Sequence, residues 1–486
     1  MNLSFGQPEQ QNRLRPKEYL IITLKKGVYI KTDLPEFKKS IQENGIEYEK
    51  IQQKYFQLTK LKSTDTLDIN EYAALNKALH VEQFPLRCAY SLKNINTFYD
   101  KLVSSKSAKA NRSNRSVCSI DNLALTFTAC YYDGTTLDEI RAQLDGIATV
   151  YAASTLTHNA TQSTALVNSC QTVSSAAPMH YQNLMRIKPT LWGSGSWAYG
   201  KKANMVIIES QGDTTYNHCE LNHRTGLNLV NLSAEGSSYS HYYWTLGTLI
   251  ADHKKKLSTV TDCLGIVPKV GINGVILINE EVTCNQGTTN DISKNNRYNA
   301  LLEGINRANG GDVLLMAFQT DAFRPVDEDS NIKILTKIAV ECLKIIIVEA
   351  AGNGSERLTI ADNSGAIIVA AAQRSGSSYV VESTSNYGTR INCFAPGYLL
   401  NVPDIGGGYS NYCCTSEAAT IMAGVIAGLQ SRYKATKGRF FTPQEIISAI
   451  DACNTPINGK KVYDNSGRLA QGKRIPFADK LWEKLP

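Results

Sequence analysis

The chain has 486 residues, of which 42% are hydrophobic and 20% are charged, a composition typical of soluble globular proteins. This length exceeds what one ordinary hydrophobic core can organise, so we expect two or three domains. The formal net charge of +7 is modest for this size, and the lysines are scattered without interleaved aromatic residues. This pattern argues against nucleic acid as a partner.

The N-terminal stretch MNLSFGQPEQQNRLRPKEYL is polar and lacks the apolar segment of a secretory signal, and no later run reaches the length of a membrane span. We therefore expect a cytoplasmic protein with no membrane partner, or one that is exported without a leader. The twelve cysteines are irregularly spaced and form no CxxC pair, which predicts reduced thiols. The adjacent Cys413 and Cys414 are either two small buried residues or a redox switch.

The N-terminal third predicts two strand-helix-strand patterns. Residues 18–60 begin and end with strand-like runs around a segment that has helix start and stop signals, and residues 123–154 repeat this order. Between them, SSKSAKANRSNRS has the composition of an exposed linker. We predict an α+β region at 1–110, a second βαβ-like unit and linker at 111–177, and a larger domain at 178–486.

In the larger domain, continuous apolar runs alternate with spacers of helix length. Runs of this kind are typical of a mostly parallel sheet that is buried on both faces by helices, so the predicted class is α/β. Sites in such folds lie where the strands end. The runs are NMVIIES, VGINGVILIN, GDVLLMAF, CLKIIIVEAAGN, GAIIVAAA and RINCFAP.

Three residues of this domain form a chemically complete set. Glu209 lies at the end of a predicted strand, His241 opens HYYWTLGTLIAD, and Ser416 lies in CTSEAATIMAGVIAGL. A serine hydroxyl is a weak nucleophile until an imidazole accepts its proton, and a carboxylate must orient that imidazole. Each residue alone has a structural explanation: a paired carboxylate, a buried histidine and a helix cap.

The order and surroundings of these residues resemble the subtilisin-like serine peptidases over roughly residues 178–455. The resemblance implies a subtilisin-like three-layer fold in which Ser416 is the nucleophile, His241 the base and Glu209 the acid. The matching phrases are HYQNLMRIKPTLW, GKKANMVIIESQGD, SHYYWTLGTLIA, GDVLLMAF, VEAAGNGS, STSNYGTRINCFAPG and CTSEAATIMAGVIAGL.

The same resemblance assigns an oxyanion hole and a substrate cleft. The Asn353 side-chain amide and the Ser416 backbone N–H would donate to the oxyanion of the tetrahedral intermediate. Asn353 and the glycine after it also suit a turn, and both explanations can hold together. Two segments would flank the substrate pocket and pair with an extended peptide. These segments consist of Ala317, Phe318, Gln319, Ala350, Ala351 and Gly352.

The chain departs from the family pattern near each of these groups. Glu209 stands where Asp is usual, so an extra methylene must be accommodated, and Asp213 is the alternative acid. The aromatic residues after His241 should narrow a subsite, and Glu417 places a carboxylate near the oxyanion. The departures are Glu209, Tyr242, Tyr243, Trp244, Cys414, Glu417 and Thr420, the last at a position that usually holds proline.

These features predict a serine endopeptidase, made as a self-processing zymogen, that selectively hydrolyses a peptide or protein substrate. Its N-terminal region would serve as a propeptide and intramolecular inhibitor, or would be an unrelated binding domain. The triad chemistry requires no cofactor. The family often carries structural calcium, but no acidic loop of this chain is specific enough to name metal ligands. The alternatives are a pseudoprotease that binds a peptide or partner, and a peptide ligase or macrocyclase.

Overall fold

The computed structural model describes part of the chain. The described residues are 18–24, 28–30, 58–60, 97–98, 101–102, 104–105, 126–131, 138, 148–155, 185–187, 198–210, 218, 220–221, 227, 229–231, 241–251, 265–278, 282–283 and 289–486, the last without 321, 360–362, 405–408, 457, 465–466 and 468. The helix expected in 33–45, all of the linker SSKSAKANRSNRS after its first two residues, and the alternative acid Asp213 lie outside the described residues. Within the described residues, no helix combines the length and apolar character needed to cross a membrane.

The chain divides into two compact units. The first comprises Met1–Tyr99, Ile120–Leu156 and Glu281–Asn295, and the second comprises Asp100–Ser119, Thr157–Glu280 and Asn296–Pro486.

The first unit contains a four-stranded antiparallel sheet in the order β4-β1-β5-β9. Because β4 and β5 flank β1 and both run antiparallel to it, they run parallel to each other. β2 and β3 form a separate antiparallel pair. The bounds are β1 (Glu18–Leu24), β2 (Val28–Ile30), β3 (Leu58–Lys60), β4 (Thr126–Tyr131), β5 (Ala148–Thr155) and β9 (Val282–Thr283).

The second unit is built on a ten-stranded sheet in the order β20-β19-β14-β13-β11-β10-β6-β8-β7, with β16 also paired to β13. In the part of this order that runs from β13 to β7, each strand is parallel to the next, and β16 is parallel to β13. The bounds are β6 (Asn204–Ser210), β7 (Leu229–Asn231), β8 (Gly271–Ile278), β10 (Val313–Met316), β11 (Ile346–Ala350), β13 (Ile367–Ser375), β14 (Ser378–Val381), β16 (Cys393–Pro396), β19 (Gly459–Tyr463) and β20 (Leu469–Pro476).

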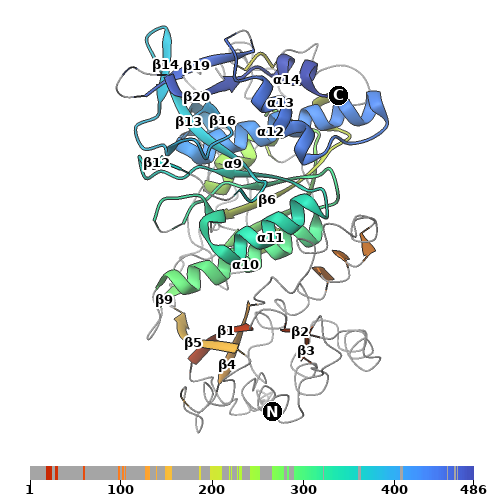
Figure 1. Cartoon of the computed structure of the whole chain (residues 1–486), viewed down its shortest axis with the longest axis vertical. Helices are drawn as coiled ribbons and strands as arrows, with labels where there is room; N and C mark the ends of the chain where they lie inside the picture. Colours follow the sequence, from red (N-terminus) through yellow and green to blue (C-terminus); the bar gives the residue numbers. More distant parts are fainter. Residues whose placement is uncertain are drawn as a thin grey trace, which may run out of the picture. The chain divides into compact units, whose positions relative to one another are not determined.

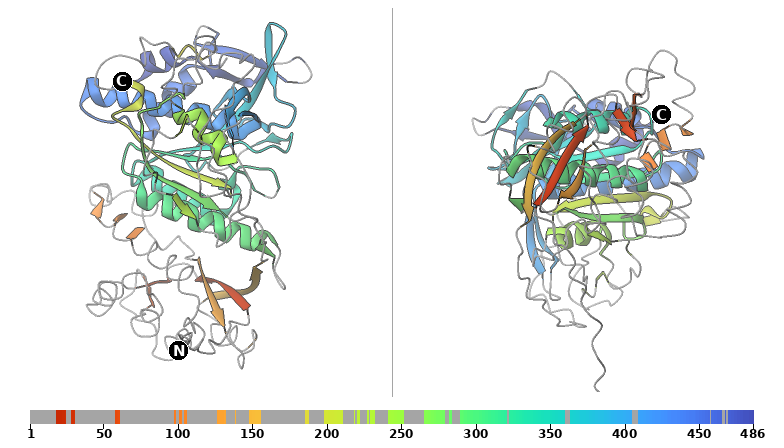
Figure 2. Two further views of the ribbon diagram at one scale, coloured as in Figure 1. Left: turned by 180° about the vertical axis from the view of Figure 1, so that it is seen from behind. Right: turned by 90° about the horizontal axis from the view of Figure 1, so that it is seen from below.

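Helices cover both faces of this sheet, as Figures 1 and 2 show: α9 and α12 lie on one side, and α10 and α11 lie on the other. The expected α/β class, with three layers around a mostly parallel sheet, is confirmed. Two further strand pairs, β12 with β15 and β17 with β18, lie outside the main sheet. The bounds are α9 (His241–Ile250), α10 (Thr289–Arg307), α11 (Ser330–Glu341), α12 (Cys414–Lys437), α13 (Pro443–Ala452), α14 (Ala478–Lys484), β12 (Arg357–Leu358), β15 (Tyr387–Gly388), β17 (Tyr398–Pro403) and β18 (Tyr409–Cys413).

Small residues let the helices of the α9–α12 face pack closely. A Cβ added to Gly424 in α12 would lie 3.1 Å from Ile266 side-chain atoms, and one added to Gly247 in α9 would lie 2.3 Å from Pro403 Cδ. The first half of α12 is buried throughout, and Gly438 ends the helix in the left-handed conformation that favours glycine.

A buried polar cluster lies behind β11. Glu349 Oε1 accepts a hydrogen bond from the Asp327 N–H at 2.9 Å. The Asp327 carboxylate is paired with Arg390 and accepts a hydrogen bond from Ser364 Oγ at 2.5 Å. Burial raises the pKa of Glu349 well above its usual value, and the nearby charge of Asp327 adds to this effect. Burial therefore favours the protonated form of Glu349.

Candidate active site

Glu209 and His241 meet because of the alternation of side chains along β6. Ile208 faces α10, since a Cβ on Gly304 of that helix would lie 3.0 Å from Ile208 Cδ1. The next residue, Glu209, points to the opposite face, where its Oε2 lies 2.6 Å from His241 Nδ1. A hydrogen bond between Nδ1–H and the carboxylate leaves Nε2 of a neutral imidazole as the proton acceptor.

The second oxygen of the Glu209 carboxylate is also held. Thr245, one turn after His241 in α9, donates its hydroxyl hydrogen to Glu209 Oε1. The Tyr412 hydroxyl lies 2.9 Å from Thr245 Oγ1, and the Tyr412 ring meets the His241 ring edge-on at a centroid distance of 5.2 Å. Because Glu209 is fully buried, these partners offset the cost of removing its oxygens from water.

Ser416 is connected to this group through Tyr412. Ser416 lies in the first turn of α12 and is 8% exposed. Thr420, one turn later, donates to the Ser416 carbonyl at 2.8 Å, and its Oγ1 lies 3.3 Å from the Tyr412 hydroxyl. The contacts therefore run from the start of α12 through Tyr412 and Thr245 to Glu209. Thr420 supplies a hydrogen bond at the position where the family usually has proline.

Asn353 is oriented by Thr415, the residue before Ser416. Asn353 Oδ1 accepts hydrogen bonds from the Thr415 N–H at 3.1 Å and from Thr415 Oγ1 at 2.7 Å. The Asn353 backbone N–H is held by Gln319 Oε1 at 2.7 Å. With its oxygen engaged, the Asn353 amide presents its two N–H donors to another acceptor. This orientation suits the stabilisation of an oxyanion.

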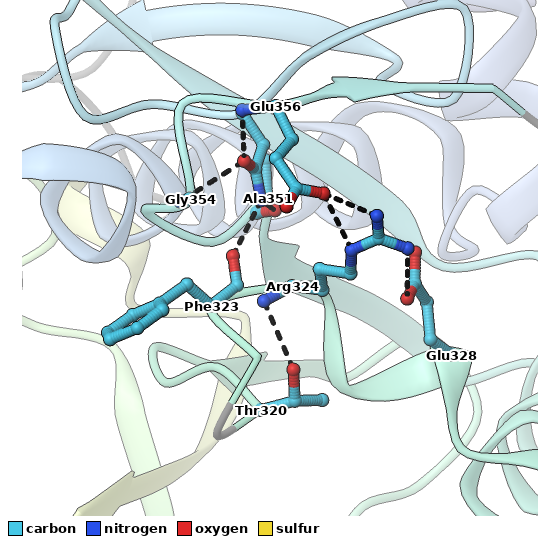
Figure 3. Close-up of polar contacts among 8 residues, drawn as sticks. Thr320, Phe323, Arg324, Glu328, Ala351, Gly354 and Glu356 are labelled. Atoms are coloured by element: carbon cyan, nitrogen blue, oxygen red, sulfur yellow. Dashed lines mark hydrogen bonds and ion pairs between the residues drawn. The ribbon is translucent and has the colours of Figure 1, made fainter.

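The loop that carries Asn353 is fixed by the buried side chain of Asn386. Asn386 Oδ1 accepts from Gly354 N at 3.1 Å and from Glu356 N at 2.8 Å. Its Nδ2 donates to Phe323 O at 2.6 Å and to Ala351 O at 2.8 Å. One amide thus ties together three segments of backbone, as Figure 3 shows for the four partners.

At the surface of this loop, Arg324 forms ion pairs with Glu356 and with Glu328, the latter at 3.4 Å. The hydrogen bond to Glu356 raises the pKa of Arg324, and the charge of Glu328 adds to the shift. Since both pairs are largely exposed, we assign them a minor part in stability.

The two segments expected to flank the substrate lie side by side. Ala317–Gln319 follow β10, and Ala350–Gly352 begin at the last residue of β11 and continue beyond it. The two strands pair in parallel. Gly352 has φ +86, and a Cβ there would lie 2.3 Å from Phe323 O, so only glycine fits. The Ala351 N–H donates to Val369 O at 3.0 Å, and Gly352 O accepts from Asn386 N at 2.9 Å. These internal bonds favour a lining role for Ala350–Gly352 over pairing with a peptide.

The aromatic residues after His241 have separate surroundings. Tyr242 and Tyr243 are buried in the core, with exposed fractions of 0% and 1%. Trp244 is half-buried, and its ring lies 5.9 Å from that of His241 and 5.8 Å from that of Tyr412. Of the three residues, Trp244 is therefore the one placed to restrict access beside the histidine.

Glu417 is fully buried next to Tyr412. Burial raises the pKa of Tyr412 well above its usual value, and the charges of Glu209 and Glu417 add to this effect. The Tyr412 hydroxyl is thus held in its neutral form, able to donate as well as accept a hydrogen bond.

Sequence reasoning missed the residues that support the site: Thr245, Thr415, Asn386 and Tyr412. A signal existed for Thr245, because a residue four positions after His241 shares its face of a helix. Among the described residues, no group of three or more His, Cys, Asp or Glu side chains could hold a metal ion. The expectation of reduced thiols is wrong at Cys342, which is disulfide-bonded.

No protein-family model matches the chain. A stretch of 133 residues is 33% identical to a thermostable alkaline protease of Halalkalibacterium halodurans and corresponds to 26% of this chain and 35% of that protein. The chain thus spans about a third of the length of the curated relative that it matches. The resemblance to a protease, expected from the motifs, is confirmed by this match.

Solved structures of proteases are also similar to the chain. One is fervidolysin from Fervidobacterium pennivorans, a keratinolytic enzyme related to subtilisin, with 18% identity, a TM-score of 0.47, and coverage of 81% of this chain and 60% of that chain. Another is the prenylagaramide maturation protease PagA, with 20% identity, a TM-score of 0.44, and coverage of 61% of this chain and 97% of that chain.

Proposed function

We propose that the second unit is a serine endopeptidase in which Ser416, His241 and Glu209 form the catalytic triad. The observation that carries this proposal is the 2.6 Å contact between His241 Nδ1 and the buried Glu209 carboxylate. That contact fixes the imidazole tautomer that a general base requires, and Tyr412 links it to the start of α12. The match to an alkaline protease supports peptide hydrolysis as the reaction.

In the proposed reaction, His241 Nε2 accepts the hydroxyl proton of Ser416 while Ser416 Oγ attacks the peptide carbonyl carbon. The imidazolium that forms is stabilised by Glu209, which remains ionised. His241 then gives the proton to the leaving amine, and the amine departs from the acyl-enzyme. Water attacks the acyl group by the same route in the second half of the reaction.

Asn353 and the Ser416 backbone N–H would donate to the oxyanion. The orientation of Asn353 by Thr415 supports this role, because its amide hydrogens are fixed before the substrate arrives. Preorganised donors of this kind lower the barrier where negative charge develops. Ala317–Gln319 and Ala350–Gly352 would line the cleft, and the half-buried Trp244 would restrict the substrates that reach His241.

The proposed chemistry uses only side chains and backbone groups of this chain. We further propose that the N-terminal region before residue 178 acts as a propeptide, inhibits the larger domain that follows it and is released by self-cleavage. The antiparallel sheet of β1, β4 and β5 is compatible with this role. A peptide or protein is the substrate class that the proposal requires.

The test is incubation of the full chain with a mixture of unlabelled peptides, followed by mass spectrometry of the products. We expect shortened peptides with the wild type and intact peptides with Ser416→Ala. Products joined through new peptide bonds would assign ligase or macrocyclase activity instead. Unchanged peptides with both proteins, in full-length and N-terminally processed form alike, would favour a pseudoprotease.

A further inference from the structure

Two adjacent thiols lie immediately before Thr415 and take no part in the proposed reaction. Cys413 ends β18 and is exposed, whereas Cys414 begins α12 and is half-buried. The Cys414 thiol donates a hydrogen bond to the Cys413 sulfur. Because the two residues are consecutive in the chain, a bond between their sulfur atoms closes only a small ring.

The backbone holds this pair in an unusual conformation. Cys414 has φ +71, in the left-handed region that residues with a Cβ rarely adopt. The Cys414 N–H is fixed by Gly397 O at 2.9 Å. Strained residues that the surroundings hold in place are concentrated at functional sites.

The two thiols differ in acidity. The hydrogen bond from Cys414 lowers the pKa of Cys413, while burial and the charges of Glu417 and Glu382 oppose this shift. Donation of that hydrogen bond, with burial, raises the pKa of Cys414. An exposed thiol with a lowered pKa next to a second thiol is the usual arrangement of a sensor cysteine and its resolving partner.

The other free cysteines of the described chain provide an internal contrast. Cys393 and Cys453 are buried. Burial raises the pKa of each of these two thiols to about 12. They are therefore expected to stay unreactive under conditions that oxidise Cys413.

We propose that Cys413 and Cys414 form a dithiol modification site that a hydroperoxide oxidises to a disulfide between the adjacent residues. The Cys413 thiolate attacks the O–O bond of hydrogen peroxide, which yields a sulfenic acid and, after protonation, one water. The Cys414 sulfur then attacks the Cys413 sulfur, the S–O bond breaks and a second water leaves. Two thiols lose two electrons and two protons, and the peroxide is reduced to two waters.

Disulfide formation would act on the Asn353 orientation through Thr415. The Thr415 N–H belongs to the peptide unit that follows Cys414, and it holds Asn353 Oδ1 at 3.1 Å. Closure of a small ring through Cys413 and Cys414 changes the backbone angles beside this peptide unit. We therefore infer slower acylation of Ser416 in the oxidised protein. This last step rests on the proposed function, whereas disulfide formation does not.

The modification is tested by treating the full chain with hydrogen peroxide, unfolding it in denaturant, blocking remaining thiols with iodoacetamide and mapping the peptides by mass spectrometry. We expect the peptide with both cysteines to lose two hydrogen atoms, while Cys393 and Cys453 are alkylated. In Cys414→Ser, oxidation should stop at a Cys413 sulfenic acid, which dimedone captures. In Cys413→Ser, hydrogen peroxide should not oxidise Cys414 and dimedone should not label it. Oxidation of Cys413 no faster than that of Cys393, or a bond from Cys413 to another cysteine, would overturn the proposal.

The consequence is tested by the rate at which a fluorophosphonate labels the reduced and oxidised wild type. We expect labelling to slow by about tenfold or more, since loss of a single oxyanion donor costs about 100-fold or more. A mild reductant should restore the rate, with the Cys342 disulfide followed in the same peptide map. An unchanged rate in disulfide-containing protein would refute the regulatory step. Absence of labelling in every state would instead count against the proposed function, and the mass map would still decide on the disulfide.

Discussion

Replacing Glu209 by aspartate, the residue usual in subtilisin-like peptidases, is expected to impair this protein. Removing one methylene retracts the carboxylate by roughly 1.5 Å, about one C–C bond length. The 2.6 Å contact between Glu209 Oε2 and His241 Nδ1 would then open to about 4 Å, beyond hydrogen-bond distance. The Thr245 hydrogen bond would be lost with it. The charge remains, but it no longer fixes the imidazole.

We expect the rate of Ser416 acylation in Glu209→Asp to fall about 100-fold, which corresponds to about 2.7 kcal/mol in the barrier. Glu209→Gln is the isosteric control, because it keeps the length and removes the charge. An amide N–H facing His241 Nδ1 would invert the tautomer, and loss of the triad acid costs about 10⁴-fold in a serine protease. Glu209→Gln should therefore be slower than Glu209→Asp.

The assay is the second-order rate constant for fluorophosphonate labelling of each full-length variant, measured by intact mass. Thermal unfolding of the same samples separates a catalytic loss from misfolding. Wild-type rates in both Glu209 variants would refute the assignment of the acid, and Asp213 would become the candidate to substitute next.

Four further outcomes are expected. Tyr412→Phe should destabilise the protein by about 1–3 kcal/mol in urea denaturation. Thr245 donates its hydroxyl hydrogen to Glu209 and Thr420 donates its own to the Ser416 carbonyl, so the hydrogen bond between Tyr412 and a threonine oxygen uses the Tyr412 hydrogen. The variant would leave that buried threonine oxygen without this donor. Asn353→Ala should slow peptide hydrolysis about 100- to 1000-fold with little change in KM, and an unchanged kcat would exclude it from the oxyanion hole. Gly247→Ala should cost about 1–3 kcal/mol of stability, because the new methyl would lie 2.3 Å from Pro403 Cδ; equal urea midpoints would show that the α9–β17 contact is looser than described. Glu349→Gln should flatten the pH dependence of stability. The pKa of Glu349 is raised in the folded protein, so its contribution to the free energy of unfolding is complete below about pH 4.5 and is lost as the pH rises. Between about pH 5 and 8, the melting temperature of the variant should therefore fall less than that of the wild type.

The sequence alone predicted the strands of the main sheet because their signals are local. The run NMVIIES corresponds to β6, Asn204–Ser210, and His241 begins α9 as expected. Long buried parallel strands are rich in apolar residues, so their positions can be inferred without knowledge of their neighbours. The position of a carboxylate at the end of such a strand follows directly.

The supporting contacts could not be predicted because they depend on packing between distant segments. Tyr412 reaches Thr245 across 167 positions of sequence. Asn386 satisfies four backbone groups in two other segments, at Phe323 and along 351–356, so no single stretch of sequence indicates its role. Likewise, whether a glutamate can serve in place of aspartate depends on the distance between β6 and α9, which residue patterns do not encode.

The central claim is that Ser416 is a nucleophile activated by His241. Intact-mass measurement of the wild type and Ser416→Ala, each incubated with and without a fluorophosphonate, tests it most directly. We predict that only the wild type gains the mass of one phosphonyl group, and that peptide mapping places this group on Ser416. Equal labelling of both proteins would contradict the claim. So would the absence of labelling in wild-type protein from which the N-terminal region has been removed by limited proteolysis.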